Sequence, residues 1–341
     1  MHQKKYKIVF SFENMGFYGR KRTVSSDIRD LEKENRGEAE MKIMSIRFLQ
    51  KEEKAILPKA VRYLPKRWQR AYIEKRKPCR WEGDMAILQT RVENSRTALW
   101  RKQAERLLEE MKQEGTAIVI PPLEGDLPRG ILPFAEGRKL TILFAFIGAA
   151  EALKRQGKEP AECRYLLAGG NEEMWRSALV SMGNEVNHLA IFTADKKTAE
   201  KLEQELFEEW GLMTEVFASA KHPAFGQADV VFCCGMEQRK YEHMLKSDAV
   251  WIDLAGNRPV LRKLQESRPD VVACDGFFFG QGKQRKEGRR AEAEAFLSCP
   301  SFRENLQGTG GKEVLCELQE RGYVVSGFSV LGKQAKIRKK P

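Results

Sequence analysis

Short apolar segments alternate with helix-like segments from residue 164 onward, and this alternation limits the fold of the chain more than any other feature. The apolar segments cover residues 164–169, 189–193, 214–217, 228–235, 249–253 and 270–275. The segment Ala228–Gly235 is apolar almost throughout, which is typical of a strand buried on both faces of a parallel sheet. Helical patterns such as Lys197–Trp210 lie between the apolar segments. Repeated strand and helix segments predict an α/β protein with a doubly wound parallel sheet.

The first apolar segment runs directly into a glycine turn, Gly169-Gly170-Asn171, and a helical pattern follows at Glu172–Met182. Strand, glycine turn and helix form the opening of a nucleotide-binding unit, in which N–H groups at the helix start hold a phosphate. Ligands of such sheets bind beyond the carboxyl ends of the strands. The candidate cofactor-binding residues are Gly169, Gly170, Asn171, Thr193, Asp195, Cys234 and Gly235.

Three stretches of this region, Ala168-Gly169-Gly170, Ile191–Leu202 and Ala228–Gly235, carry a resemblance to a known family. Their order resembles the cofactor-binding half of the shikimate dehydrogenase family and, as a second match, the related domain of glutamyl-tRNA reductase. The resemblance covers residues 139–282. It implies a Rossmann-like domain that binds NAD or NADP.

Two further stretches extend this resemblance toward the substrate. Asp253–Asn257 with Pro259 is similar to the segment that follows the nicotinamide loop in the family, and Gly280-Gln281-Gly282 is similar to its substrate-facing step. The resemblance therefore implies substrate-binding roles for Asn257 and Gln281.

The glycine turn departs from the family pattern at both ends. Leu167 stands where the first glycine is expected, and Glu172 stands near the last small residue. A carboxylate at a helix N-terminus repels an approaching pyrophosphate. Asp195 could accept ribose hydroxyls, which favours NAD over NADP, and the arginine that would hold a 2′-phosphate is missing.

The sequence offers weak candidates for acid/base chemistry, namely Lys139, Asp253 and Asp275. Two functions follow. The first is an oxidoreductase that binds NAD(P) or a related nucleotide and acts on a small carbonyl substrate. The second is a non-catalytic descendant of the fold, in which a basic N-terminal region contacts protein or nucleic acid.

The N-terminal part of the chain reads differently from the rest. Residues 1–40 are expected to be a flexible extension or a translated leader, with the natural start at Met41 or Met44. Residues 41–137 are predicted to be a basic, mainly helical domain that includes a helix at Val92–Glu114. The Rossmann-like domain is expected over 138–332, followed by a basic disordered tail over 333–341.

The charge of +12 is concentrated in the N-terminal region, where residues 42–80 contain thirteen Lys or Arg against three Glu. Trp68 and Tyr72 lie among Lys66, Arg67, Arg70, Lys75, Arg76 and Lys77. Aromatic residues among basic ones can bind nucleic acid. Three- and four-residue spacing favours instead a core stripe with basic neighbours that extend into solvent.

The seven cysteines form no C-x-x-C pair, and the four histidines are far apart in sequence. This distribution predicts no metal site and no disulfide framework, and it favours reduced thiols in the cytoplasm. No apolar run reaches the roughly 18 residues of a membrane span.

Overall fold

The computed structural model describes residues 41–48, 59–69, 79–82, 84–88, 98–123, 125, 127–183, 186–219, 221–235, 242–280, 284–305, 311–335 and 337. All of these residues belong to one compact unit, 41–341. The predicted extension or leader over residues 1–40 lies outside them. So do Gln281, Arg70, Lys75, Arg76 and Lys77.

The centre of this unit is a six-stranded parallel sheet of the order β10-β9-β8-β5-β6-β7. Its strands are β5 (Arg164–Gly169), β6 (His188–Phe192), β7 (Thr214–Phe217), β8 (Val230–Gly235), β9 (Val250–Asp253) and β10 (Val272–Cys274). Read from β7 to β10, the order of appearance in the chain is 3-2-1-4-5-6, which is the Rossmann order. The prediction of a doubly wound α/β fold is confirmed.

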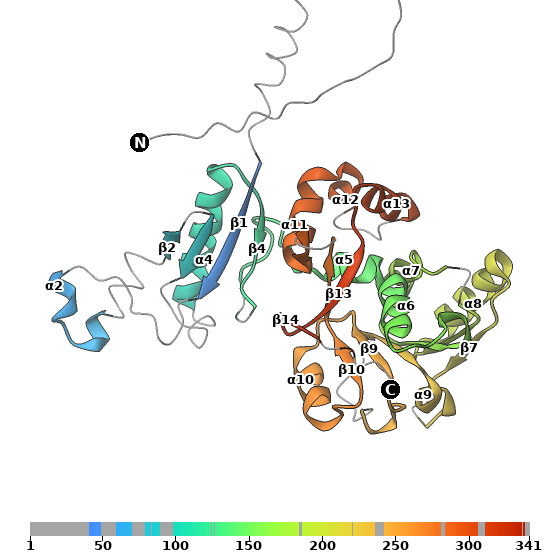
Figure 1. Ribbon diagram of the computed structural model, residues 1–341. Helices are drawn as coiled ribbons and strands as arrows, with labels where there is room; N and C mark the ends of the chain where they lie inside the picture. The colour runs from blue at the N-terminus through green and yellow to red at the C-terminus, as the bar shows by residue number, and fades with distance from the viewer. Residues whose placement is uncertain are drawn as a thin grey trace, which may run out of the picture. The chain divides into compact units, whose positions relative to one another are not determined.

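The sheet is covered on both faces, because successive residues of its central strand enter different cores. Tyr165 and Leu167 of β5 belong to one buried cluster, whereas Leu166 and Ala168 belong to a second. The first cluster includes α6 (Ala145–Arg155), α7 (Glu172–Leu179) and α8 (Lys196–Trp210), and the second includes α9 (Pro223–Gln227) and α10 (Arg258–Ser267). Figure 1 shows these two groups of helices on opposite sides of the strands.

Two helices precede the parallel sheet in the sequence. They are α5 (Arg138–Leu143) and α6, which meet at Phe144 with a backbone φ of −102°. The short η2 (Pro160–Glu162) then leads into β5. A single turn, η3 (Glu242–Met244), precedes β9.

A second sheet, antiparallel and of the order β12-β11-β13-β14, follows the parallel one in sequence. It contains β11 (Gly276–Phe279), β12 (Lys286–Glu287), β13 (Val325–Val330) and β14 (Lys333–Gln334), with α11 (Gly288–Ser298), α12 (Pro300–Glu304) and α13 (Lys312–Glu320) between strands. The prediction of a disordered tail from residue 333 is wrong at its start, because Lys333 and Gln334 pair with Val330 and Ser329.

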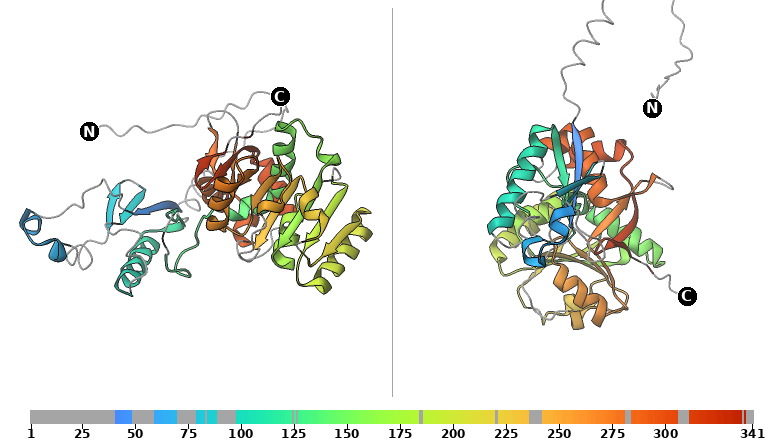
Figure 2. Two further views of the ribbon diagram at one scale, coloured as in Figure 1. Left: turned by 90° about the horizontal axis from the view of Figure 1, so that it is seen from below. Right: turned by 90° about the vertical axis from the view of Figure 1, so that its left-hand side faces the viewer.

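The described residues of the N-terminal region contain a four-stranded sheet as well as helices. The order is β2-β3-β1-β4, with β1 (Lys42–Phe48) parallel to both β3 (Met85–Leu88) and β4 (Thr116–Ile120), and β2 (Cys79–Glu82) antiparallel to β3. Helix α4 (Ala98–Gln113) lies along this sheet, as Figure 2 shows from two sides. The short helix α2 (Lys59–Arg62) lies between β1 and β2 in the sequence. Met44, Ile46 and Phe48 alternate with less buried residues, so β1 has the period of a strand.

Within the described residues, no helix has the length and apolar character needed to cross a membrane.

Candidate functional site

The carboxyl ends of β5 and β8 meet where the strand order reverses, and glycine occupies both ends. Gly169 pairs with Gly235, and Gly170 lies against Cys234. A Cβ atom on Gly170 would come within 2.6 Å of the Cβ and carbonyl oxygen of Cys234. The three glycines have φ values of 72°, 84° and 128°, which side chains rarely permit. The backbone is thus bare at the point where open α/β sheets bind ligands.

The glycine turn is fixed by a tryptophan from the following helix. The indole Nε1 of Trp175 donates a 2.7 Å hydrogen bond to the carbonyl oxygen of Gly169, and Trp175 is fully buried. Trp175 lies in the helix that the sequence predicts at Glu172–Met182, but the sequence analysis did not identify this contact. A tryptophan that follows a glycine turn by one helical turn is the signal that could have identified this contact.

The first turn of α7 carries two carboxylates, which have different surroundings. Glu172 forms a 2.7 Å ion pair with Arg176, and Arg176 also contacts Glu205 of α8 at 2.6 Å. Hydrogen bonds to Glu172 and Glu205 raise the pKa of Arg176. Glu172 therefore has a cationic partner, which lessens the repulsion expected from the sequence. Glu173 lines a cavity instead.

The predicted ligand-binding side chains near β5 and β6 also have structural roles. The Oδ1 of Asn171 accepts a 3.1 Å hydrogen bond from the Met174 N–H and caps α7. Asp195 caps α8, because its carboxylate accepts hydrogen bonds from the Thr198 N–H at 3.3 Å and from the Thr198 hydroxyl at 2.7 Å. Buried Thr193 accepts from the Asp195 N–H at 3.1 Å. Asp195 remains exposed, and each of its oxygens has a further lone pair for a ribose hydroxyl.

Asp253 and Asp275 line a cavity of about 300 Å³ beyond the ends of β9 and β10. Asp253 is 3% exposed, and its Oδ1 accepts hydrogen bonds from the N–H groups of Ala255 and Gly256, both at 3.1 Å. Its Oδ2 has no hydrogen-bond partner among the described residues. Burial raises the pKa of Asp253 to about 6, and the charge of Asp275 adds to this effect. Asp253 can therefore exchange a proton near neutral pH.

Asp275 has more complete hydrogen bonding than Asp253. Its carboxylate accepts from the Leu331 N–H at 3.1 and 3.2 Å and from the Ser329 hydroxyl at 3.4 Å. Burial raises the pKa of Asp275, whereas the Leu331 N–H and the charge of Arg258 oppose this shift. Asp275 thus connects the end of β10 to β13.

Arginines supply the positive charge of this smaller cavity, which is lined by Arg129, Arg138, Arg258 and Arg289. Arg138 Nε donates a 2.6 Å hydrogen bond to the carbonyl oxygen of Leu254. Arg129 pairs with Glu136, and Arg289 pairs with Glu287, both at 2.7 Å. Asn257, predicted to bind substrate, caps α10 by accepting from the Val260 N–H at 3.4 Å. It does not line this cavity.

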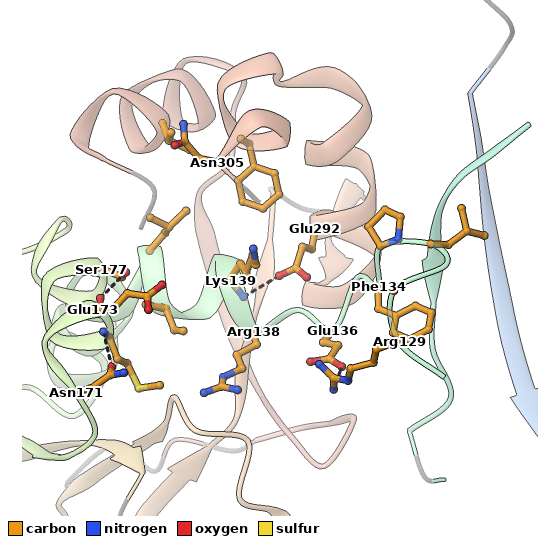
Figure 3. Close-up of a pocket in the computed structure, with 18 of the residues that line it drawn as sticks. Arg129, Phe134, Glu136, Arg138, Lys139, Asn171, Glu173, Ser177, Glu292 and Asn305 are labelled. Carbon is orange, nitrogen blue, oxygen red and sulfur yellow. Dashed lines mark hydrogen bonds and ion pairs between the residues drawn. The ribbon is translucent and has the colours of Figure 1, made fainter. Parts of the chain in front are cut away.

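Lys139 lies in a larger cavity of about 600 Å³, which shares Arg138 with the smaller one (Figure 3). Its wall includes Glu292 of α11, which is 1% exposed and accepts hydrogen bonds from the N–H groups of Lys139 at 2.9 Å and Leu140 at 3.2 Å. Burial raises the pKa of Glu292 to about 7. Burial also lowers the pKa of Lys139, although the charges of Glu292 and Glu173 oppose this change.

The three predicted catalytic residues are therefore divided between two adjoining cavities. Asp253 and Asp275 lie together, and Lys139 lies in the other cavity. The sequence analysis missed Arg138, Glu173 and Glu292. The last two are brought together from helices that are more than one hundred residues apart in the chain.

The segment over 63–77, in which aromatic residues lie among basic ones, is exposed where the structure describes it. Trp68 is 64% exposed and Tyr63 is 90% exposed, and Lys66 and Arg67 are also at the surface. The prediction that Trp68 belongs to a core stripe is wrong, because this side chain lies outside the buried clusters. Tyr72 lies outside the described residues.

The described cysteines Cys163, Cys233, Cys234, Cys274, Cys299 and Cys316 are all free thiols. Among the side chains that the structure places, no three His, Cys, Asp or Glu residues come together as metal ligands would.

No protein-family model and no curated protein matches the chain. Several solved structures do. Δ(1)-pyrroline-2-carboxylate reductase from Thermococcus litoralis, in complex with NADH and L-proline, matches at 12% identity and a TM-score of 0.27 over 44% of this chain and 42% of that one. Shikimate 5-dehydrogenase from Listeria monocytogenes matches at 10% identity and a TM-score of 0.32 over 82% and 96%.

L-tryptophan dehydrogenase from Nostoc punctiforme matches at 11% identity and a TM-score of 0.37 over 84% of both chains. This chain spans less than half the length of the pyrroline-2-carboxylate reductase. At these identities the likenesses concern the fold alone.

Proposed function

We propose that the protein binds a nicotinamide dinucleotide at the carboxyl edge of the parallel sheet and acts as an oxidoreductase on a small carbonyl substrate. The observation that carries this proposal is the exposed glycine backbone of Gly170 and Gly235, which lies at the crevice where the strand order reverses. A pyrophosphate needs close approach to the backbone at such a point, and glycine presents no side chain there.

The residues around the crevice have roles that suit this ligand. Exposed Asp195 accepts ribose hydroxyls, which favours NAD over NADP. The turn after β9, with Asp253, Ala255 and Gly256, lines the cavity in which the reacting end of the ligand and the substrate meet. A bound reduced nicotinamide supplies a hydride. Asp253 holds the proton that the carbonyl oxygen requires, and the neighbouring arginines attract an anionic substrate.

Calorimetric titration of NAD, NADH, NADP and NADPH tests the proposal directly. Asp195→Asn keeps a side chain that can cap α8 but removes the charge, so we expect affinity for NAD to fall by roughly tenfold to a hundredfold. Glu200→Gln makes the same change in charge on the exposed side of α8 and is the matched control. Failure of all four dinucleotides to bind at millimolar concentration would overturn the proposal.

A second function is favoured by the exposure of Trp68 and Tyr63 beside Lys66 and Arg67. We propose as the alternative that this segment binds single-stranded nucleic acid. Its aromatic side chains stack on bases, its basic side chains neutralise phosphates, and the α/β domain serves as a non-catalytic support. Trp68→Ala should weaken binding of an oligonucleotide, and Lys66→Glu with Arg67→Glu should also reduce its dependence on salt. Equal binding by these variants and the unaltered protein would exclude the alternative.

A further inference from the structure

The lining of the larger cavity is partly apolar and partly charged. Its apolar side chains include Leu132 and Phe134 from the segment before α5, Phe302 of α12 and Val314 of α13. Its volume of about 600 Å³ falls within the range of small-molecule pockets. An occupant with a bulky apolar group would bury that group against these side chains.

Side chains of opposite charge, from two different helices, line this cavity. Lys139 comes from α5 and Glu173 from α7, and Figure 3 shows both among the side chains that surround the hollow. Their charges interact, since the carboxylate of Glu173 raises the pKa of Lys139. Ser177 and Asn305 add neutral polar groups to the same lining.

We propose that the larger cavity binds a free α-amino acid with a bulky apolar side chain. Lys139 binds the carboxylate of the amino acid, Glu173 binds its ammonium group, and Phe134 and Phe302 contact its side chain. Glu173 is exposed and Lys139 is half-buried. An amino acid offers each of these two charges an opposite charge, whereas a simple carboxylic acid or a simple amine pairs with only one of them, so the zwitterion is preferred to either.

Glu292 does not compete for the ammonium group. Its Oε2 accepts the N–H groups of Lys139 and Leu140, so this carboxyl group serves the start of α5. Burial also raises its pKa to about 7, and a large share of the group is therefore neutral at that pH. Glu136 also lines the cavity, and it pairs with Arg129 at 2.7 Å. Glu173 is thus the carboxylate of this lining that is left to bind an ammonium group.

The position of the cavity connects this ligand with the proposed reaction. Arg138 lines both cavities, so an amino acid in the larger one lies next to the smaller cavity that contains Asp253. The assignment of the amino acid as the reduced partner of an imino acid, whose C=N bond takes up the hydride and the proton in place of a C=O bond, rests on the proposed function. Binding of the amino acid itself does not require the dinucleotide.

Calorimetry without dinucleotide tests the binding step. The probes are L-phenylalanine, 3-phenylpropionate, phenethylamine and L-serine, which remove in turn the ammonium group, the carboxylate and the bulky side chain. We expect L-phenylalanine to bind at least tenfold more tightly than each of the other three. Failure of L-phenylalanine to bind at millimolar concentration, or equal affinity for all four probes, would overturn the inference.

Variants locate the ligand within the molecule. Lys139→Met and Glu173→Gln should each weaken L-phenylalanine binding at least tenfold, whereas Lys139→Arg should restore most of the affinity. Lys154→Met and Glu209→Gln, at exposed positions of α6 and α8, are matched controls. Circular dichroism confirms folding of each variant. Unchanged binding by folded Lys139→Met would overturn the inference, and failure of dinucleotide titrations alone would overturn only the proposed oxidoreductase.

Discussion

Two buried carboxyl groups, Asp253 in the smaller cavity and Glu292 in the larger one, share a raised pKa but differ in their hydrogen bonds. The Oε2 of Glu292, in α11, accepts hydrogen bonds from two N–H groups of α5, which lies more than one hundred residues earlier in the sequence. Asp253 uses one oxygen for the turn after β9 and leaves the other without a partner among the described residues. Burial alone therefore does not mark a reactive group. The proposed proton donor, Asp253, differs from the helix cap, Glu292, in this unused oxygen.

The largest expected effect is on turnover by Asp253→Asn. If Asp253 supplies the proton, kcat for carbonyl reduction should fall by roughly 100-fold to 10,000-fold, with dinucleotide affinity nearly unchanged. Reduction by the unaltered protein should also decline above about pH 6, because the protonated form is then depleted. Steady-state kinetics and a pH profile measure both effects. If Asp253→Asn retained kcat, Asp253 would not be the proton donor, and it would not differ from Glu292 in this role.

Glu292→Ala should affect stability rather than chemistry. The change leaves the N–H groups of Lys139 and Leu140 without their acceptor and creates a space in a buried wall, so we expect a loss of about 2 to 4 kcal/mol in the free energy of unfolding. Urea denaturation measures the loss. Glu292→Gln keeps an acceptor oxygen and is the control, and an equal loss in that variant would show that the cap is unimportant.

The raised pKa values of Glu292 and Asp253 each make stability depend on pH over a stated interval. The folded chain retains the proton of Glu292 up to about pH 7, whereas the unfolded chain releases it near the ordinary value of 4.5, so stability falls as pH rises through this interval. Glu292→Gln removes this dependence and should gain up to about 3 kcal/mol relative to the unaltered protein between pH 4.5 and 8.

For Asp253→Asn the corresponding interval runs from 3.8 to about 6 and has the same sign. Urea denaturation at several pH values would show the two intervals. If the stability of the unaltered protein did not fall as pH rises through these intervals, the raised pKa values of the two groups would be contradicted.

Trp175→Phe should give the smallest effect. The phenyl ring keeps most of the apolar packing but cannot donate to the Gly169 carbonyl oxygen, so a loss of about 1 kcal/mol is expected. Affinity for NAD should fall together with stability if the crevice depends on this contact. Thermal unfolding and calorimetry on one preparation test both, and unchanged values would show that the turn is held by other contacts.

The parallel sheet could be predicted because buried strands leave apolar runs such as Ala228–Gly235 in the sequence. The N-terminal sheet could not. Lys42–Phe48 alternates Met44, Ile46 and Phe48 with partly buried residues, including Arg47, and such a short pattern is ambiguous beside charged neighbours. The strands β1 and β4 pair through residues that are 75 positions apart in the sequence, as Ser45 with Ile120 shows.

The candidate site was predicted in part for a related reason. The strand-end rule selects Gly170 and Asp253 because both follow apolar segments. No local pattern places Arg138 beside Leu254, or Glu292 beside the start of α5, because both contacts join residues more than one hundred positions apart. Burial of Glu292 likewise depends on the packing of α11, which the sequence shows only as a helix.

The contact between Trp175 and Gly169 has a consequence for the thermodynamics of binding. A glycine turn is ordinarily a flexible segment that loses conformational freedom when a ligand orders it. Here the indole holds the turn before any ligand arrives. Occupation of the crevice should therefore carry a small entropic penalty from the backbone, and its heat capacity change should reflect the burial of ligand surface rather than the ordering of the turn.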